Sequence, residues 1–238
     1  MKRFKVFRIL LIFFAFTQTS VFADTITVAC SQWKPHYYQE DGIIKGTGYE
    51  IAKAVMEQAK VVAEFQVQPW KRVYITGLNK ANYMISCLGR TPEREPFFHW
   101  IGPVAKTIHY NFYKLKKSKF TVKSHRDILQ YRVGVMRGSL TQNFMENMSH
   151  EDIHGVSRAE QLIKLLKVGR VDLILEATNV IEHESKTANI DPDIFEMATV
   201  GYELSINMAV GKKTPLSVVQ AIQEAYKSLE MDGKITFP

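Results

Sequence analysis

Arg94 follows the end of a predicted strand, which is a position where an arginine can bind an anion. Residues 83–94 read YMISCLGRTPER, an apolar run that ends at a glycine, a short turn and a proline. Such a run predicts a strand followed by a loop, and in open α/β sheets ligands bind beyond the strand ends. A guanidinium there can hold a carboxylate or a phosphate through two parallel hydrogen bonds. The alternative is a surface arginine that pairs with Glu93 or Glu95.

Three other regions carry residues that could line a binding site. Trp33, Tyr37 and Tyr38 share one polar loop, where they either form a platform for a ligand or pack against each other. Trp70 is either a pocket wall or a core residue. Ser139 follows a glycine at a predicted helix start, where capping the helix and contacting a ligand are compatible roles.

His150 and His154 are four residues apart, the spacing of some metal-binding pairs on helices. The sequence HEDIH lacks the HExxH order and lies in a predicted loop, which favours surface histidines. The sequence also contains no G-x-S-x-G elbow, Walker loop or Rossmann glycine pattern. We therefore expect neither a metal site nor a cofactor.

The first 23 residues have the layout of a secretory signal peptide. A basic segment, MKRFKVFR, precedes the apolar run ILLIFFAF, and small residues end at Ala23. That run has eight residues, whereas spanning a bilayer takes about 20, so a retained anchor is the weaker alternative. No cysteine stands at the cleavage point. We expect a free periplasmic protein that is cleaved after Ala23.

Cleavage would change the charge of the chain. The leader carries four basic residues and no acidic one, so its removal leaves 215 of 238 residues and lowers the net charge from +7 to +3. A balance of that size does not indicate a nucleic-acid partner. Cys30 and Cys87 remain, and each closes an apolar strand. In an oxidising compartment they could form a disulfide if those strand ends are neighbours; two buried free thiols are the alternative.

Strands and helices alternate along the mature chain, as in parallel α/β sheets. The first series has strands at 26–30, 64–67 and 83–87, with helices at 51–62 and 69–78. The second series has strands at 132–136, 171–175 and 205–210, with helices after 138, at 159–168 and at 178–186. Ser157 and Glu160 predict a capping box. A last helix has Thr214 as its predicted N-cap, Pro215 in its first position and Gly233 past its end.

These elements predict two lobes joined by two crossings, near 101–107 and 198–204. Lobe 1 is predicted to comprise residues 24–104 and 202–238, because a lone last helix most simply returns to the first lobe. Lobe 2 comprises residues 105–201, and the signal peptide comprises residues 1–23.

Five segments in this order resemble the bacterial extracellular solute-binding proteins of family 3, the amino-acid-binding components of ABC importers. They are KGTGYEIAKAVMEQA, PWKR with GLNKANYMISCLGRTPERE, VGVMRGS, VGRVDLILEA, and MAVGKKTP with LEMDG. The resemblance implies a two-lobed, periplasmic-binding-protein-like α/β fold of type II. Each lobe is an α/β sandwich around a mostly parallel sheet, and a two-crossing hinge closes the lobes on the ligand.

The resemblance also implies a set of ligand-binding residues. Arg94 matches the arginine that holds the ligand carboxylate, and Ser139 matches the group of the second lobe that completes carboxylate binding. The remaining matched positions are Thr91, Gly89, Cys87, Trp33 and Trp70.

One position departs from the family pattern. The aspartate that usually pairs with the ligand amine falls on Ala177, and Glu176 is adjacent. Neighbouring residues of a strand point to opposite faces. Either the strand end is offset and Glu176 serves, or the ligand lacks an ordinary α-ammonium group.

The resemblance implies a monomeric periplasmic protein that captures a small polar carboxylate-bearing solute, such as an amino acid. It would deliver this small-molecule ligand to an inner-membrane ABC permease. Two alternatives share the scaffold. One is an enzyme similar to cyclohexadienyl dehydratase, with Glu176 as its acid. The other is a sensory module that presents its ligand-bound form to a receptor.

Overall fold

The computed structural model describes residues 25–237. The predicted signal peptide, residues 1–23, lies outside the described residues. None of the described helices is long and apolar enough to cross a membrane.

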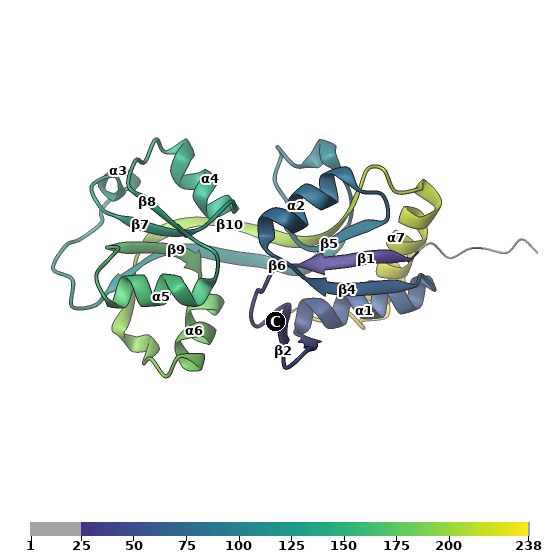
Figure 1. Cartoon of the computed structure of the whole chain (residues 1–238), viewed down its shortest axis with the longest axis horizontal. Coiled ribbons are helices and arrows are strands. Elements are labelled where there is room, and N and C mark those ends of the chain that lie inside the picture. The colour runs from purple at the N-terminus through teal and green to yellow at the C-terminus, as the bar shows by residue number, and fades with distance from the viewer. Residues whose placement is uncertain (1–24, 238) are drawn as a thin grey trace, which may run out of the picture.

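Two long strands connect the two lobes of the molecule (Figure 1). They are β6 (Phe98–Leu115) and β10 (Phe195–Gly211), which pair antiparallel along most of their length. They occupy the centre of one eight-stranded sheet with the order β4-β1-β5-β10-β6-β9-β7-β8. Because the same two strands run from one lobe into the other, bending them changes the angle between the lobes.

Lobe 1 is built on three parallel strands next to β10. In sheet order they are β4 (Ala63–Val67), β1 (Ile26–Cys30) and β5 (Tyr83–Gly89). Their helices are α1 (Thr47–Ala59), α2 (Trp70–Asn79) and α7 (Leu216–Met231). Successive strand residues point to opposite faces: Val28 packs in the core cluster of α1 and α7, and Ala29 packs in the cluster of α2. Helices therefore cover both faces of this half of the sheet.

Lobe 2 repeats this arrangement next to β6. Its strands are β9 (Leu173–Ala177), β7 (Val133–Met136) and β8 (Ile153–Val156), with β7 parallel to both neighbours. Its helices are α3 (His125–Ile128), α4 (Leu140–Asn147), α5 (Ala159–Lys167) and α6 (Thr178–Thr187). Ile174 packs with α5 and α6, while the next residue, Leu175, packs with α3 and α4.

Smaller elements connect these parts. A two-stranded sheet is formed by β2 (Tyr38–Glu40) and β3 (Ile43–Lys45). Two short 3-10 helices are η1 (Glu95–Phe97) and η2 (Pro192–Ile194). A disulfide joins Cys30 to Cys87, with 5.6 Å between their Cα atoms. It links the neighbouring parallel strands β1 and β5 close to their carboxyl ends.

One predicted strand is longer in the structure, and two predicted helix caps are wrong. The strand predicted at 205–210 runs over Phe195–Gly211, because its first part is only half-buried and forms no continuous apolar run. Thr214 does not cap α7; its hydroxyl instead accepts the backbone N–H of Asn82 at 2.9 Å. The cap of α5 is shifted by one residue, since Gln161 accepts the N–H groups of Ser157 and Arg158.

Candidate ligand-binding site

A cavity of about 110 Å³ lies between the lobes, beyond the carboxyl ends of parallel strands from both of them. This is the edge where open α/β sheets bind ligands. Seven of the residues singled out from the sequence line it: Trp33, Trp70, Cys87, Gly89, Arg94, Ser139 and Glu176. Thr91 does not line it, and lies instead beside Arg90 in a separate hollow next to α4. The carbonyl oxygen of Thr91 accepts the N–H of Arg94 at 3.0 Å, so Thr91 helps to form the turn that carries the arginine.

Arg94 is buried in the wall of this cavity and is 6% exposed. Its Nη1 donates to the carbonyl oxygen of Gly89 at 3.1 Å. Its guanidinium carbon lies 4.9 Å from the ring centre of Tyr74 and 5.8 Å from that of Trp70, the geometry of cation–π contacts. Burial lowers the pKa of Arg94, but a guanidinium remains charged in proteins. The alternative of a surface arginine that pairs with an acid applies to Arg90 and not to Arg94. Arg90 pairs with Glu95 at 2.6 Å.

Glu176 brings a carboxyl group to the lobe 2 side of the cavity. It is buried, and its Oε1 accepts the N–H of Ala177 at 2.9 Å. Burial, assisted by the carboxyl group of Glu184 and partly offset by the hydrogen bond from Ala177, raises the pKa of Glu176 to about 7. Ala177 is also buried but does not line the cavity. Of the two adjacent positions, the structure therefore places Glu176 at the cavity.

The hinge strands contribute two aromatic residues that the sequence analysis missed. Tyr110 on β6 and Tyr202 on β10 both line the cavity, and their rings stack with 4.9 Å between centres. The hydroxyl of Tyr202 is buried and has no hydrogen-bond partner within residues 25–237. Tyr202 lies within the crossing predicted near 198–204. An aromatic residue at such a crossing between lobes was the signal that could have identified it as a cavity residue.

The loop after β1 divides its aromatic residues between two roles. Trp33 lines the cavity, and its ring lies 4.2 Å from that of His36. Tyr37 is fully buried in the lobe 1 core, with its hydroxyl donating to the carbonyl oxygen of Val28 at 3.2 Å. Lys34 also lines the cavity and was missed, because a single lysine in a polar loop has no distinguishing sequence signal.

Ser139 caps α4 and at the same time lines the cavity. Its hydroxyl donates to the carbonyl oxygen of Met136 at 2.7 Å and accepts the N–H of Thr141 at 3.2 Å. The helix start therefore presents its N–H groups, which favour an anion, toward the cleft. Ser139 holds that helix start in place.

Direct hydrogen bonds cross the cleft and hold the lobes together. The Nε1–H of Trp70 in lobe 1 donates to the carbonyl oxygen of Gly138 in lobe 2 at 2.9 Å. In a second contact between the lobes, His36 meets the side chain of Asn179 at the start of α6. Burial, assisted by His183, lowers the pKa of His36 to about 4, so its ring is neutral at pH 7. In this structure the two lobes are therefore in direct contact across the cleft.

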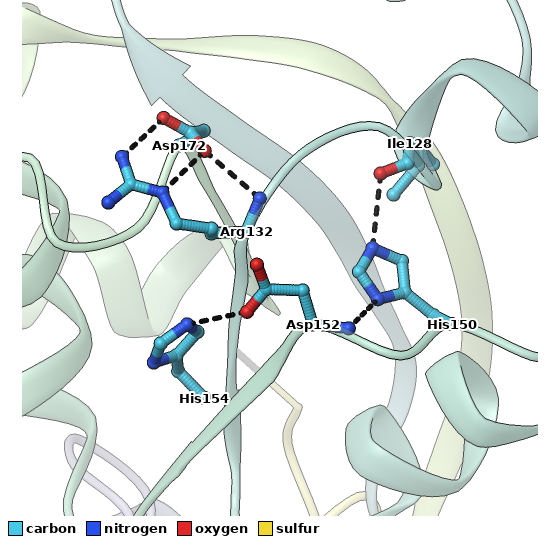
Figure 2. Close-up of polar contacts among 6 residues, drawn as sticks. All are labelled: Ile128, Arg132, His150, Asp152, His154 and Asp172. Carbon is cyan, nitrogen blue, oxygen red and sulfur yellow. Dashed lines mark hydrogen bonds and ion pairs between the residues drawn. The ribbon is translucent and has the colours of Figure 1, made fainter.

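His150 and His154 do not converge on a common point (Figure 2). The ring of His150 is buried, and both of its nitrogens contact backbone: Nε2 lies 3.1 Å from the carbonyl oxygen of Ile128, and Nδ1 accepts the N–H of Asp152. Nε2 of His154 lies 2.8 Å from the carboxylate of Asp152. Within residues 25–237, no group of three or more His, Cys, Asp or Glu side chains is placed to hold a metal ion.

The sequence profile of the bacterial extracellular solute-binding proteins, family 3, matches residues 26–236. The chain belongs to this family. The resemblance read from its motifs is thereby confirmed. No curated protein matches the chain.

Three similar solved structures show the same fold. A histidine kinase sensor domain with similarity to periplasmic binding proteins has a TM-score of 0.80 at 13% identity, covering 89% of this chain and 92% of its own. The arginine-, lysine-, histidine-binding protein ArtJ from Geobacillus stearothermophilus has a TM-score of 0.73 at 21% identity. The match covers 89% of this chain and 92% of ArtJ. The ancestral amino-acid-binding protein AncCDT-1, a precursor of cyclohexadienyl dehydratase, has a TM-score of 0.72 at 18% identity. The match covers 88% of this chain and 90% of AncCDT-1.

The predicted fold class is confirmed: the protein has the two-lobed α/β fold of periplasmic binding proteins. Identities of this size establish the fold alone. The ligand must therefore be argued from the side chains of this cavity.

Proposed function

We propose that this protein binds a small amino acid as a zwitterion in the cavity between its lobes. Arg94 binds the carboxylate from lobe 1, and Glu176 binds the α-ammonium group from lobe 2. The observation that carries the proposal is the presence of a buried guanidinium and a buried carboxyl group in one cavity, each from a different lobe. A ligand with both charges contacts both lobes, so its binding favours the closed arrangement.

Each end of the ligand meets groups suited to its charge. Nη1 of Arg94 is used by Gly89, which leaves its other N–H groups available for a carboxylate. The N-terminus of α4, capped by Ser139, adds a favourable field for the same anion. The carboxyl group of Glu176 accepts one hydrogen bond, from Ala177. It therefore has further acceptor positions for an ammonium group.

The aromatic residues provide contact area around these two charges. Trp33 and Trp70 line the cavity from lobe 1, and the stacked pair of Tyr110 and Tyr202 lines it from the hinge strands. Rigid aromatic rings contribute apolar contact at a small cost in side-chain entropy. Cys87 and Gly89 complete the lobe 1 wall.

Membership of the family supports a role in solute capture outside the cytoplasm. We propose that the chain is exported through its 23-residue leader and acts in the periplasm as a monomer. It would deliver its amino acid to an ABC permease in the inner membrane. Pull-down of membrane proteins by the ligand-bound protein, with the ligand-free protein as control, tests the permease partner. Recovery of a receptor kinase instead would favour the sensory alternative.

A ligand panel on two variants tests the proposed function. We expect thermal shift and calorimetry to detect at least one of the twenty L-amino acids binding to the wild type. In Arg94→Ala the affinity should fall at least 100-fold, because the ligand carboxylate loses its charged partner. Arg90→Ala is the matched control, since this exposed arginine pairs with Glu95 and should retain wild-type affinity. Undiminished binding by Arg94→Ala would contradict the proposal.

The pKa of Glu176, raised to about 7, also suits a general acid, which is the observation that favours a dehydratase as a second candidate. The assay is turnover of prephenate-like cyclohexadienyl acids, with Glu176→Gln as the control. Turnover by the wild type that is lost in Glu176→Gln would favour the enzyme over the binding protein.

A further inference from the structure

We propose that the bound amino acid carries a compact, uncharged side chain, and that the cavity excludes arginine and lysine. This inference rests on the proposed function, in which Arg94 and Glu176 hold the α-carboxylate and the α-ammonium group. It concerns the remaining part of the cavity, which receives the side chain of the ligand.

The charges that face the cavity leave nothing to neutralise a basic side chain. Arg94 and Lys34 are the cations among the described residues that line it, and Glu176 is the only carboxyl group there. Once Glu176 binds the α-ammonium group, a guanidinium or ammonium on the side chain has no anionic partner. Burying a charge without a partner is strongly unfavourable. The carboxylates of neutral and basic ligands are bound alike, so this cost falls on basic ligands alone.

The acids closest to the cavity do not change this balance. Glu184 on α6 raises the pKa of Glu176 but does not line the cavity. Burial raises the pKa of Glu184 itself, and Lys34 partly offsets this rise. Glu160, at the start of α5, pairs with Arg158 at 3.0 Å. Both carboxyl groups therefore lie outside the space that a ligand side chain would occupy.

Five apolar residues of the wall come from several elements. This apolar wall consists of Met136, Leu140, Ala159, Val180 and Ile206. Burying these side chains against an apolar ligand group is favourable, because both surfaces leave water. Ser31, Gln32 and Thr141 also line the cavity. Their oxygens can accept hydrogen bonds, but they carry no charge and cannot neutralise a guanidinium. The wall therefore favours an aliphatic side chain.

The size of the cavity limits the length of that side chain. Its volume is about 110 Å³, smaller than the apolar cavity of about 150 Å³ that binds benzene in an engineered protein. A long, extended side chain would need the lobes to open. Opening would break the contact between Trp70 and Gly138 and that between His36 and Asn179.

The similar fold of ArtJ sharpens this inference. That protein is described as binding arginine, lysine and histidine, yet the fold is common to both chains. Selectivity must then come from the side chains around the cavity. An added acid on the apolar wall should convert this cavity toward basic ligands.

Met136 is the best place for such an acid. It is the last residue of β7, it lines the cavity, and it is only partly buried. A glutamate there can be accommodated without burying its charge completely. Met136→Gln, which has nearly the same shape and no charge, is the matched control.

Calorimetry with alanine, valine, lysine and arginine tests the inference on the wild type and both variants. We expect the wild type to bind valine or alanine at least 100-fold more tightly than arginine or lysine. Met136→Glu should bind arginine or lysine at least tenfold more tightly than Met136→Gln does. Tightest binding of a basic amino acid by the wild type would overturn the inference and leave the proposed function intact. If the wild type binds none of the twenty amino acids, the proposed function itself is wrong.

Discussion

The two lobes hold their charged residues in the cavity in different ways. In lobe 1, Arg94 donates to Gly89 and lies against two aromatic rings, so it is positioned before a ligand arrives. In lobe 2, the carboxyl group of Glu176 accepts one backbone N–H and is buried beside a second acid. Lobe 1 therefore presents a preorganised cation, whereas lobe 2 presents an acid that a bound cation would stabilise.

The two lobes also differ in how their neighbouring strands are linked: lobe 1 has a disulfide and lobe 2 has an ion pair. In lobe 1, the disulfide between Cys30 and Cys87 joins β1 to β5 directly below the cavity. In lobe 2, Arg132 and Asp172 link the starts of β7 and β9, with two side-chain hydrogen bonds of 2.9 and 2.8 Å (Figure 2). Redox conditions should therefore act on lobe 1, and pH should act on lobe 2.

Removing the disulfide should have the largest effect on stability. It closes a loop across 57 positions of the sequence, so the double variant Cys30→Ala, Cys87→Ala should lose about 4 kcal/mol of unfolding free energy. Chemical denaturation measures this loss. A reductant should destabilise the wild type but not the variant. Equal stability of the two proteins would show that the disulfide does not stabilise the folded state.

Glu176→Gln should reverse the cost of burying the acid in lobe 2. Its pKa is raised from 4.5 to about 7, so between these pH values the folded state retains a proton that the unfolded state releases. The free energy of unfolding of the wild type therefore falls as pH rises through this window, by about 3 kcal/mol. The variant has no such proton to lose and should be more stable than the wild type at pH 8, and about equal at pH 4.

Denaturation at pH 4, 6 and 8 measures that difference without a ligand. Glu182→Gln, which alters an exposed residue on α6, is the matched control and should leave stability unchanged at each pH. An equal response of Glu176→Gln and wild type to pH would show that Glu176 is ionised at no cost in the folded state.

The ion pair of lobe 2 should contribute less than the disulfide of lobe 1. Asp172 accepts from the backbone N–H of Arg132 as well as from its guanidinium, so Asp172→Ala should cost about 2 kcal/mol. Hydrogen bonds from Arg132 lower the pKa of Asp172. This contribution is therefore present at neutral pH and is lost as pH falls below about 4. An unchanged midpoint of denaturation at pH 7 would contradict this role.

Trp70→Phe should have the smallest effect, because it removes one hydrogen bond and keeps the aromatic ring. Trp70 donates to Gly138 of the other lobe, so moving the lobes apart would break this hydrogen bond. Its loss should weaken ligand binding by about fivefold, equivalent to about 1 kcal/mol. Calorimetry with the best ligand measures it. Unchanged affinity would mean that this bond does not contribute to closure.

The sequence predicted the parts of the fold that have strong local patterns. Strand 26–30 and helix 178–186 were placed within a residue or two. Their patterns, an apolar run and a helical spacing, can each be recognised within a single segment. The long strand β6 was missed, and only the last part of β10 was predicted, since their central residues cross between the lobes half-exposed and show no apolar run. Thr214 was misjudged because its hydroxyl meets Asn82, a partner 132 residues away.

The candidate site could be predicted only where a motif carried it. Arg94 and Ser139 stand in recognisable segments, and both line the cavity. Choosing between Glu176 and Ala177 required knowing which residues of β9 face the cavity. A shift of one residue in the strand reverses the two faces. Tyr110 and Tyr202 come from strands far apart in the sequence that meet only in the folded sheet. Their role in the cavity is a property of that pairing.

Calorimetry with three matched compounds tests most directly whether the two lobes share a zwitterion. Valine carries both charges, 3-methylbutanoate lacks the amine, and 2-methylpropylamine lacks the carboxylate. If a carboxylate meets Arg94 while an ammonium group meets Glu176, valine should bind at least 100-fold more tightly than either analogue. Binding of 3-methylbutanoate as tightly as valine would contradict the account, because the acid of lobe 2 would then have no part in recognition.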